Sequence, residues 1–117
     1  MTQHSGLSPE RWNGFPFAQQ LLMIGNEMHR ASKLGDPSDA ERRRNSYERV
    51  LALVDLTIGG TDRRAVRREL LRWREVVGAM YLATEHDARL HRSALRVLLL
   101  MTPESAQQAE FVAPRQQ

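Results

Sequence analysis

Arginine is the residue type whose number and spacing in this sequence point most directly to chemistry. Sixteen of the seventeen basic residues are arginine, and Lys33 is the exception. Residues 42–74 hold ten arginines against four acidic residues, whereas the stretches on either side are mildly acidic. A guanidinium group binds phosphate or carboxylate through two parallel hydrogen bonds, which a lysine ammonium does not do. The pattern indicates a site for an anion, and a GC-rich genome that favours arginine codons is the alternative explanation.

The arginines of residues 42–74 fall mainly at the starts of two predicted helices. A helix N-terminus carries a positive partial charge, so a sequence selected for stability alone places acidic residues there. A phosphate, an RNA or DNA strand or an acidic protein surface would compensate these arginines. The alternative is a solvated helix face on which Asp62, Glu69 and Glu75 are the ion-pair partners. The candidate anion-binding and nucleic-acid-binding residues are Arg42, Arg43, Arg44, Arg64, Arg67, Arg68 and Arg72.

The sequence lacks the residue patterns of the common catalytic and metal sites. It has no cysteine, which excludes disulfides, thiolate zinc sites and cysteine nucleophiles. Its four histidines are His4, His29, His86 and His91, and none belongs to the Glu-x-x-His motif of di-iron helix bundles. Nucleophile-elbow, P-loop and dinucleotide-binding motifs are also missing from the sequence. We therefore expect no enzyme activity, no catalytic residue, no metal and no cofactor.

Asp55 is the acidic residue with the most informative position. It lies beside Leu51 and Ile58, which belong to the apolar stripe of a predicted helix. The next helix along the chain brings arginines past this position, so we expect a salt bridge from Asp55 to Arg67 or Arg74. A partly buried pair of this kind contributes more to stability than an exposed pair does.

Apolar residues recur every three or four positions in four stretches, which is the period of an amphipathic helix. The predicted helices cover residues 17–33, 39–58, 63–83 and 86–101. Because the loops between them are short, consecutive helices are expected to pack as antiparallel neighbours. The expected fold is all-α, an antiparallel up-down-up-down four-helix bundle. Its expected core consists of Leu21, Ile24, Met28, Tyr47, Leu51, Val54, Leu70, Trp73, Val77, Val97 and Leu98.

The length of 117 residues fits one domain. We expect an aromatic N-terminal segment over residues 1–16, the bundle over residues 17–101 and a C-terminal tail over residues 102–117 with a short helix near residues 104–110. The longest unbroken apolar run, residues 97–101, is far shorter than the ~20 residues that a membrane span needs. No signal peptide is visible, so we expect a cytoplasmic protein that does not cross a membrane.

Two groups of apolar residues indicate a surface for another protein. The leucines of residues 95–100 follow one another around the helix, so they cannot all face one core. We expect them to join two copies of the chain in a homodimer, or to dock the chain on a larger protein, with the C-terminal tail as the other possible cover. The aromatic segment near the N-terminus is either a lid over one end of the bundle or a docking segment. The candidate interface residues are Leu95, Leu98, Leu99, Leu100, Trp12 and Phe15.

Three stretches carry a resemblance to a known architecture: LMIGNE at 22–27, NSYERVLALVDLTI at 45–58 and RELLRWREVV at 68–77. Over about residues 12–83 the chain resembles small, functionally unassigned bacterial helical proteins that are similar in architecture to HEPN-type four-helix bundles. Active HEPN ribonucleases carry an Arg-x(4–6)-His motif, and no arginine here has a histidine at that spacing. The resemblance therefore implies a helical bundle without ribonuclease activity.

Taken together, these patterns favour a non-catalytic helical interaction module or accessory subunit that acts through protein–protein contacts. An RNA- or DNA-binding helical protein that uses the arginines of residues 42–74 is the alternative. A steep loss of affinity with rising salt is expected only of the second.

Overall fold

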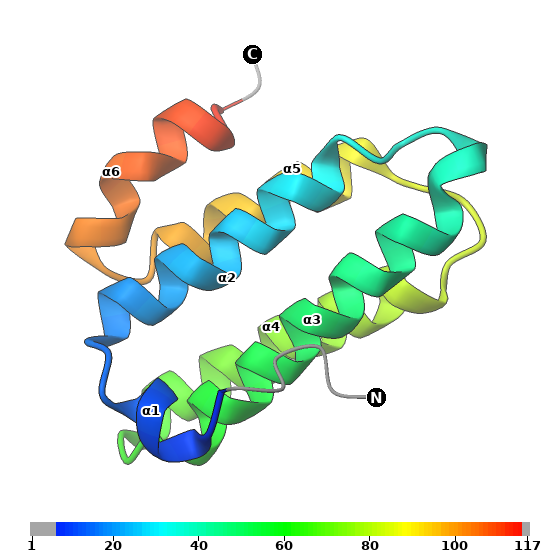
Figure 1. Cartoon of the computed structure of the whole chain (residues 1–117). Helices are drawn as coiled ribbons and strands as arrows, with labels where there is room; N and C mark the ends of the chain where they lie inside the picture. The colour runs from blue at the N-terminus through cyan, green and yellow to red at the C-terminus, as the bar shows by residue number, and fades with distance from the viewer. Residues whose placement is uncertain (1–6, 116–117) are drawn as a thin grey trace.

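The computed structural model describes residues 7–115, and all regular structure in that range is helical (Figure 1). One short 3-10 helix in this range, η1, lies between the second and third α-helices. The α-helices are α1 (Pro9–Asn13), α2 (Phe17–Ser32), α3 (Ala40–Gly59), α4 (Arg64–Leu82), α5 (Ala88–Leu99) and α6 (Pro103–Val112), and η1 covers Pro37–Asp39.

The four long predicted helices and the short tail helix are present, with ends that differ by at most two residues from expectation. The helix starts follow local chemistry. The Asp87 carboxylate accepts hydrogen bonds from the backbone N–H groups of Arg89 and Leu90, so α5 begins at Ala88. The Thr102 hydroxyl caps α6 in the same way, and a proline occupies the first position of that helix.

The four long helices surround one core. α2 packs against α3 and α5, α3 packs against α4, and α4 and α5 make the least extensive contact of these neighbouring pairs. In Figure 1, α2 and α5 lie side by side, as do α3 and α4. α1 packs on α3, and α6 lies on α5 and α2. Each long helix buries one apolar stripe in the same cluster of side chains. The amphipathic period of the sequence therefore determines which residues form this core.

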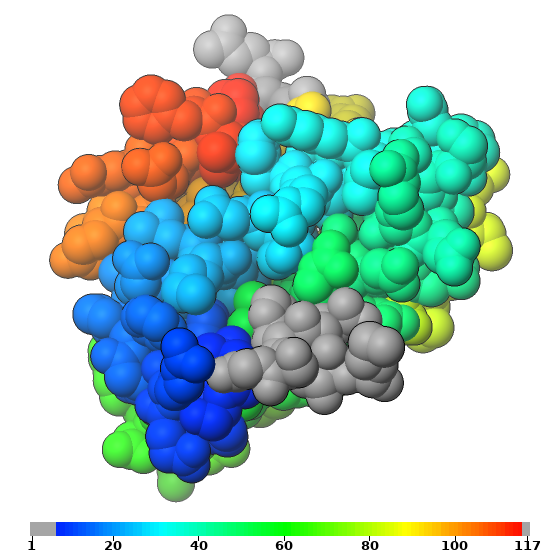
Figure 2. Space-filling model, viewed as in Figure 1, coloured from blue at the N-terminus to red at the C-terminus, as the bar shows by residue number. Residues whose placement is uncertain are grey.

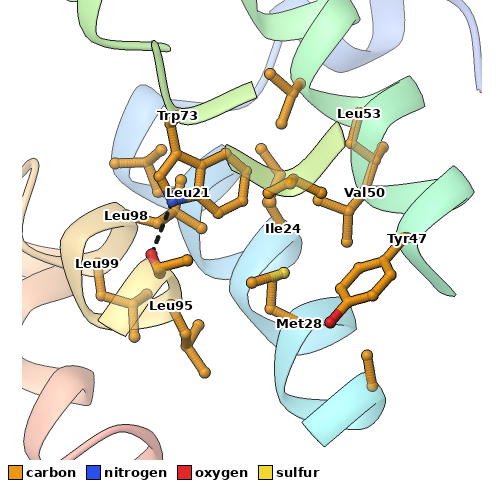
Figure 3. Close-up of a cluster of buried hydrophobic side chains, with 14 of the residues drawn as sticks. Leu21, Ile24, Met28, Tyr47, Val50, Leu53, Trp73, Leu95, Leu98 and Leu99 are labelled. Atoms are coloured by element: carbon orange, nitrogen blue, oxygen red, sulfur yellow. Dashed lines mark hydrogen bonds between the residues drawn. The ribbon is translucent and has the colours of Figure 1, made fainter. Parts of the chain in front are cut away.

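Buried side chains from α2, α3, α4 and α5 interdigitate in the core (Figure 3). The indole N–H of Trp73 donates a hydrogen bond of 2.7 Å to the carbonyl of Ala94, which ties α4 to α5. Gly25 lets α2 approach α5 closely, since a Cβ at this position would lie 3.0 Å from a methyl group of Leu99. Full burial of a Leu, Ile or Val side chain contributes roughly 1.5–3 kcal/mol, so this cluster supplies the main stabilising term.

Nine of the eleven predicted core residues are buried. The prediction of Val97 as a core residue is wrong, because its side chain is half exposed. Ala94, Leu95 and Leu98 form the buried face of α5, and Val97 therefore points outward. Leu51 is only partly buried and packs at the edge of the cluster.

The C-terminal segment covers part of α5 rather than leaving it open to a second copy of the chain. Ser105, Ala109 and Ala113 are buried, and the Ser105 hydroxyl donates a hydrogen bond of 2.6 Å to the carbonyl of Leu99. Figure 2 shows the atoms of α6 closing against those of α2. The cover uses small residues of α6, whereas Phe111 stays exposed.

This packing corrects the expectation that the leucines of residues 95–100 face a partner. Leu95, Leu98 and Leu99 are each at most 1 % exposed within the single chain, because α2 covers them from one side and α6 lies beside them. Leu100, which follows α5, is half exposed and is the member of that group that remains on the surface. Among the described helices, none is both long and apolar enough to cross a membrane.

Candidate protein-binding groove

The loose contact between α4 and α5 leaves a groove with an apolar floor on the outside of the molecule. Its volume is about 250 Å3. The large apolar side chains that border it are partly open to solvent: Val76 is 37 % exposed, Leu90 41 % and Val97 50 %. α4 contributes Glu69, Arg72, Trp73 and Val76 to the lining, and α5 contributes Leu90, Ser93, Ala94 and Val97.

The sequence produces this groove through residue size at the contact. Trp73 is held by its hydrogen bond to the Ala94 carbonyl, so its ring is buried and forms part of the floor. Ser93 and Ala94 are small, so α5 leaves a depression where a larger side chain would fill the space between the helices. The sequence reasoning missed this site because it placed Val97 in the core and did not pair α4 with α5 residue by residue.

The groove is set in a basic surface. α4 and α5 together contain eight arginines and two glutamates. On the α4 side, Arg72 lies 3.8 Å from Glu69 in an exposed pair. On the α5 side, a second depression of about 210 Å3 shares Ser93 with the groove. Its other lining residues are Arg89, Arg92, Arg96, Pro114 and Arg115.

Within residues 7–115, the arginines on the α5 side differ in whether they form an ion pair. Arg96 donates hydrogen bonds to the Glu110 carboxylate at 2.9 Å and to the Ala113 carbonyl at 3.1 Å, so its charge is already used within the chain. Over residues 7–115, Arg89 and Arg92 have no ion-pair partner. In the part of the chain that the structure describes, this side of the groove therefore carries positive charge that no acidic side chain pairs with.

The predicted anion-binding arginines lie on two helices, at the start of α3 and along the first half of α4. Arg64, Arg67 and Arg68 surround an open depression of about 410 Å3 with Asp62 and Leu71. The remaining α4 candidate, Arg72, lines the apolar groove instead. The arginines at residues 42–44 lie at the start of α3, and none of them lines this depression. Most of the 20-residue helix α3 lies between the two groups in the chain, so the basic stretch does not form one site.

The group at residues 42–44 also differs internally. Arg43 is buried and donates a hydrogen bond of 2.6 Å to the Leu34 carbonyl, so the prediction that it binds an external anion is wrong. Its guanidinium supplies a hydrogen-bond donor to a backbone carbonyl in the loop that joins α2 to α3. Arg42 is exposed and pairs with Asp39, and Arg44 is exposed.

In the described part of the N-terminal segment, residues 7–16, Trp12 packs inward as a lid over one end of the helices. Trp12 lies in the short helix α1, is fully buried, and donates its indole N–H to the Thr57 hydroxyl at 2.9 Å. The prediction of Trp12 as an interface residue is therefore wrong, because α3 already covers its ring. Phe15 meets Trp12 edge to face with ring centres 6.1 Å apart and is partly exposed.

A buried pair of side chains, Tyr47 of α3 and His91 of α5, joins these two helices. The Tyr47 hydroxyl lies 2.7 Å from His91 Nδ1, and His91 Nε2 lies 2.7 Å from the Met28 carbonyl. A carbonyl only accepts, so Nε2 carries the proton and Nδ1 accepts from the tyrosine. The pKa of His91 is lowered to about 4, mainly by burial. The hydrogen bond to the Met28 carbonyl opposes this change, and the nearby His86, His29 and Arg43 add smaller contributions that lower the pKa.

Both side chains of this pair are closed to solvent. Tyr47 is 2 % exposed and His91 is 1 % exposed, so a substrate does not reach either group. Burial also raises the pKa of Tyr47 to about 12, which keeps its hydroxyl protonated as the donor. The two residues are 44 positions apart, and no sequence spacing signals their contact.

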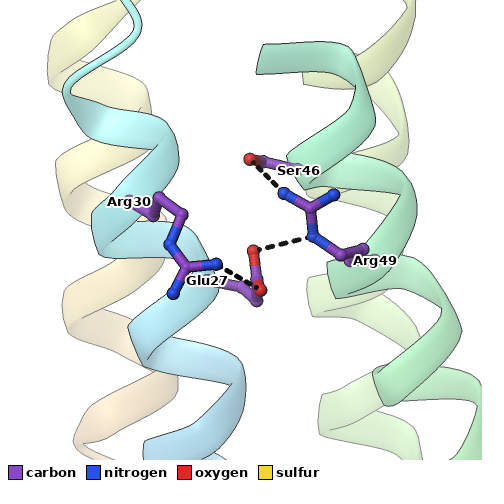
Figure 4. A network of polar contacts seen from close by, with 4 residues as sticks. All are labelled: Glu27, Arg30, Ser46 and Arg49. Carbon is purple, nitrogen blue, oxygen red and sulfur yellow. Dashed lines mark hydrogen bonds and ion pairs between the residues drawn. The ribbon is translucent and has the colours of Figure 1, made fainter. Parts of the chain in front are cut away.

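A second polar network joins α2 to α3 (Figure 4). The Glu27 carboxylate is nearly buried and accepts from Arg49 Nε at 3.1 Å and from Arg30 Nη1 at 3.1 Å. Arg49 also donates to the Ser46 hydroxyl at 3.1 Å. Each charge in this network has a partner, which offsets the cost of removing it from water.

The predicted salt bridge of Asp55 is confirmed, with Arg74 as its partner. Arg74 donates to both carboxylate oxygens, at 2.5 and 3.1 Å, and this hydrogen bonding raises the pKa of the guanidinium. The expected partial burial is wrong, because the side chains are 53 % and 41 % exposed. The second alternative, Arg67, points to the depression at the start of α4 instead.

Comparison of the chain with protein-family models, with curated proteins and with solved structures found no match. The resemblance to HEPN-type bundles stays a prediction. Within residues 7–115, no group of three or more His, Asp or Glu side chains is placed to hold a metal ion. The site that the geometry brings forward is therefore the apolar groove between α4 and α5.

Proposed function

We propose that this protein is a non-catalytic interaction module whose α4–α5 groove binds an apolar segment of another macromolecule. In this proposal the four long helices form an up-down-up-down antiparallel bundle, similar in architecture to HEPN-type bundles, and the bundle serves as a rigid frame for the groove. The chain acts as an accessory subunit, in the cytoplasm, through protein–protein contacts.

The partial exposure of Val76, Leu90 and Val97 around one depression carries this proposal. Scattered single apolar residues are normal on a protein surface, but a contiguous set around a concave site marks an interaction surface. The charges of the polar network around Glu27 are paired with one another, and the Tyr47–His91 pair is closed to solvent. Neither of them supports a reaction.

Photo-crosslinking in living cells tests the groove directly. A benzophenone amino acid at Val97 is expected to form adducts with a partner on irradiation. The same amino acid at Leu82, which is 78 % exposed on α4 outside the groove lining, is the matched control. Adducts that form equally from both positions, or from neither, contradict the proposal.

RNA or DNA binding is the second candidate function, and the depression between Arg64, Arg67 and Arg68 favours it. Three exposed arginines at a helix start offer contacts to phosphate groups. Fluorescence anisotropy with a labelled oligonucleotide at several salt concentrations tests this candidate. Affinity that falls steeply with salt and is lost in the Arg64→Ala/Arg68→Ala variant supports it, whereas equal affinity of this variant and the parent contradicts it.

A further inference from the structure

We propose that the partner of the α4–α5 groove is an acidic amphipathic helix from a different protein. This inference rests on the proposed function, because it states which kind of partner the same groove accepts. Three observations carry it: the length of the groove, the charge around it, and the small area of apolar surface that it offers.

The groove has the length of two helical turns. Leu90 and Val97 border it seven residues apart on α5, which corresponds to about 10 Å at the rise of an α-helix. Glu69 and Val76 have the same separation on α4. A helix that docks in such a groove presents apolar side chains at positions i, i+3 or i+4, and i+7, which span the same distance. The geometry therefore matches three anchor residues of one partner helix.

The charge around the groove selects an acidic partner. Arg89 and Arg92 have no ion-pair partner in the described part of the chain, and both lie in the depression that adjoins the groove at Ser93. Arg72 lines the opposite wall, where Glu69 is the one acidic residue. A helix with Asp or Glu beside its apolar stripe meets the α5 arginines on one side and Arg72, which pairs with Glu69 at 3.8 Å, on the other. A basic helix is repelled by the α5 arginines.

A second copy of the chain fits this surface poorly. A two-fold dimer brings the same patch of both copies together, so the arginines of one α5 would face those of the other. A stable dimer also buries about 800 Å2 on each partner, and three partly exposed apolar residues in a short groove supply much less. A single docked helix needs a smaller area and satisfies the charge.

Nucleic acid also fits the groove poorly. Single-stranded nucleic acid binds to exposed aromatic rings on which bases stack. The one aromatic ring in this lining, Trp73, is buried and hydrogen-bonded to Ala94. The walls are aliphatic, which suits the side chains of a partner helix.

Selection from a displayed peptide library tests the proposal with the full chain. The library encodes helices about 15 residues long, the length at which isolated helices approach stability in water, with apolar anchors fixed and all flanking positions randomised. Peptides are selected on the parent chain and counter-selected on the Val97→Asp variant. The selected peptides are expected to be rich in Asp and Glu beside the anchors, and to lose about tenfold or more in affinity for Val97→Asp. Leu82→Asp is the matched control that keeps full affinity.

Charge reversal separates the acidic character of the partner from simple apolar binding. Arg89→Glu/Arg92→Glu is expected to weaken the selected peptides about tenfold and to accept versions in which lysine replaces the acidic residues. Arg42→Glu/Arg44→Glu, which changes two exposed arginines on α3, keeps the parent affinity. Thermal melts of all variants show that the fold is retained.

Each other outcome overturns the inference in a recognisable way. If the selected peptides have no excess of acidic residues, or are insensitive to the Arg89/Arg92 reversal, the proposal of an acidic partner is contradicted. The proposal that the groove binds a helix is retained in that case. Sedimentation equilibrium that shows self-association abolished by Val97→Asp makes a second copy the occupant. An oligonucleotide that competes with the selected peptides points to nucleic acid, and failure to select any helix against Val97→Asp removes the helical partner. Crosslinking at Val97 does not depend on partner charge, so it reports separately on the proposed function.

Discussion

The buried histidine predicts that the fold loses stability in mild acid, and that one residue causes most of the loss. His91 has a pKa of about 4 in the folded chain against an ordinary value of 6.5 in the unfolded chain. Between these pH values the unfolded chain binds a proton that the folded chain does not bind. The free energy of unfolding therefore decreases as the pH falls from 6.5 toward 4, and it is fully restored above 6.5. The gap between the two pKa values corresponds to about 3 kcal/mol.

Urea denaturation followed by circular dichroism at closely spaced pH values measures this effect. His91→Gln removes the titrating group while an amide N–H remains to face the Met28 carbonyl, so the variant is expected to show a much shallower decrease across the same pH range. The comparison uses the slope with pH, so a constant loss of stability from the substitution does not affect it. His86→Gln is the control: burial also lowers the pKa of this less buried histidine, but the variant keeps most of the slope.

Tyr47→Phe gives a second test that keeps the histidine in place. Without the tyrosine O–H, Nδ1 loses the donor that stabilises its neutral form, so the pKa of His91 in the folded chain rises toward 6.5. The gap between the folded and unfolded pKa values then shrinks, so the free energy of unfolding is expected to decrease less between pH 6.5 and 4 than it does in the parent. If the slope between pH 4 and 6.5 is the same in the parent and in His91→Gln, the proton is bound elsewhere and the reasoning is refuted.

Three further predictions concern stability and are measured by chemical denaturation at neutral pH. Glu27→Ala is expected to lower the free energy of unfolding by about 3 kcal/mol, because it removes the carboxylate that pairs with the partly buried guanidinium of Arg49; a loss below about 1 kcal/mol contradicts this. Asp55→Ala is expected to cost only about 0.2–1 kcal/mol, since its pair is exposed, and a larger loss would indicate a buried role. Trp12→Phe is expected to cost about 1–3 kcal/mol through the lost hydrogen bond to Thr57, and an unchanged midpoint would show that this contact is not needed.

The long helices could be predicted from the sequence because their apolar period reports directly on the buried stripe. The same period identified the Asp55 pairing with the following helix, since neighbours joined by a short loop must pack side by side. α1 escaped prediction because a helix of five residues contains too few positions to show a period. Its single buried residue, Trp12, stood out in the sequence as an aromatic residue, but one residue does not indicate that the segment is helical.

The candidate site could be predicted less well, because its features arise between elements. Arg43 reads as a free cation until the Leu34 carbonyl is placed beside it, and that carbonyl is a backbone group with no sequence signature. Val97 reads as core because its apolar character does not state which side of α5 faces α4. The groove is formed by residues of both α4 and α5, so no pattern within one helix predicts it.

The position of Arg115 has a practical consequence for how the protein is handled. Together with Pro114 it lines the basic depression that adjoins the groove, so the end of the described chain lies beside the surface proposed to bind a partner. A purification tag joined beyond this residue is held there at an effective concentration that reaches the millimolar range for short flexible linkers. An acidic tag at this end acts as a tethered competitor and masks weak partners, whereas a tag at the other end of the chain is not held there by Arg115.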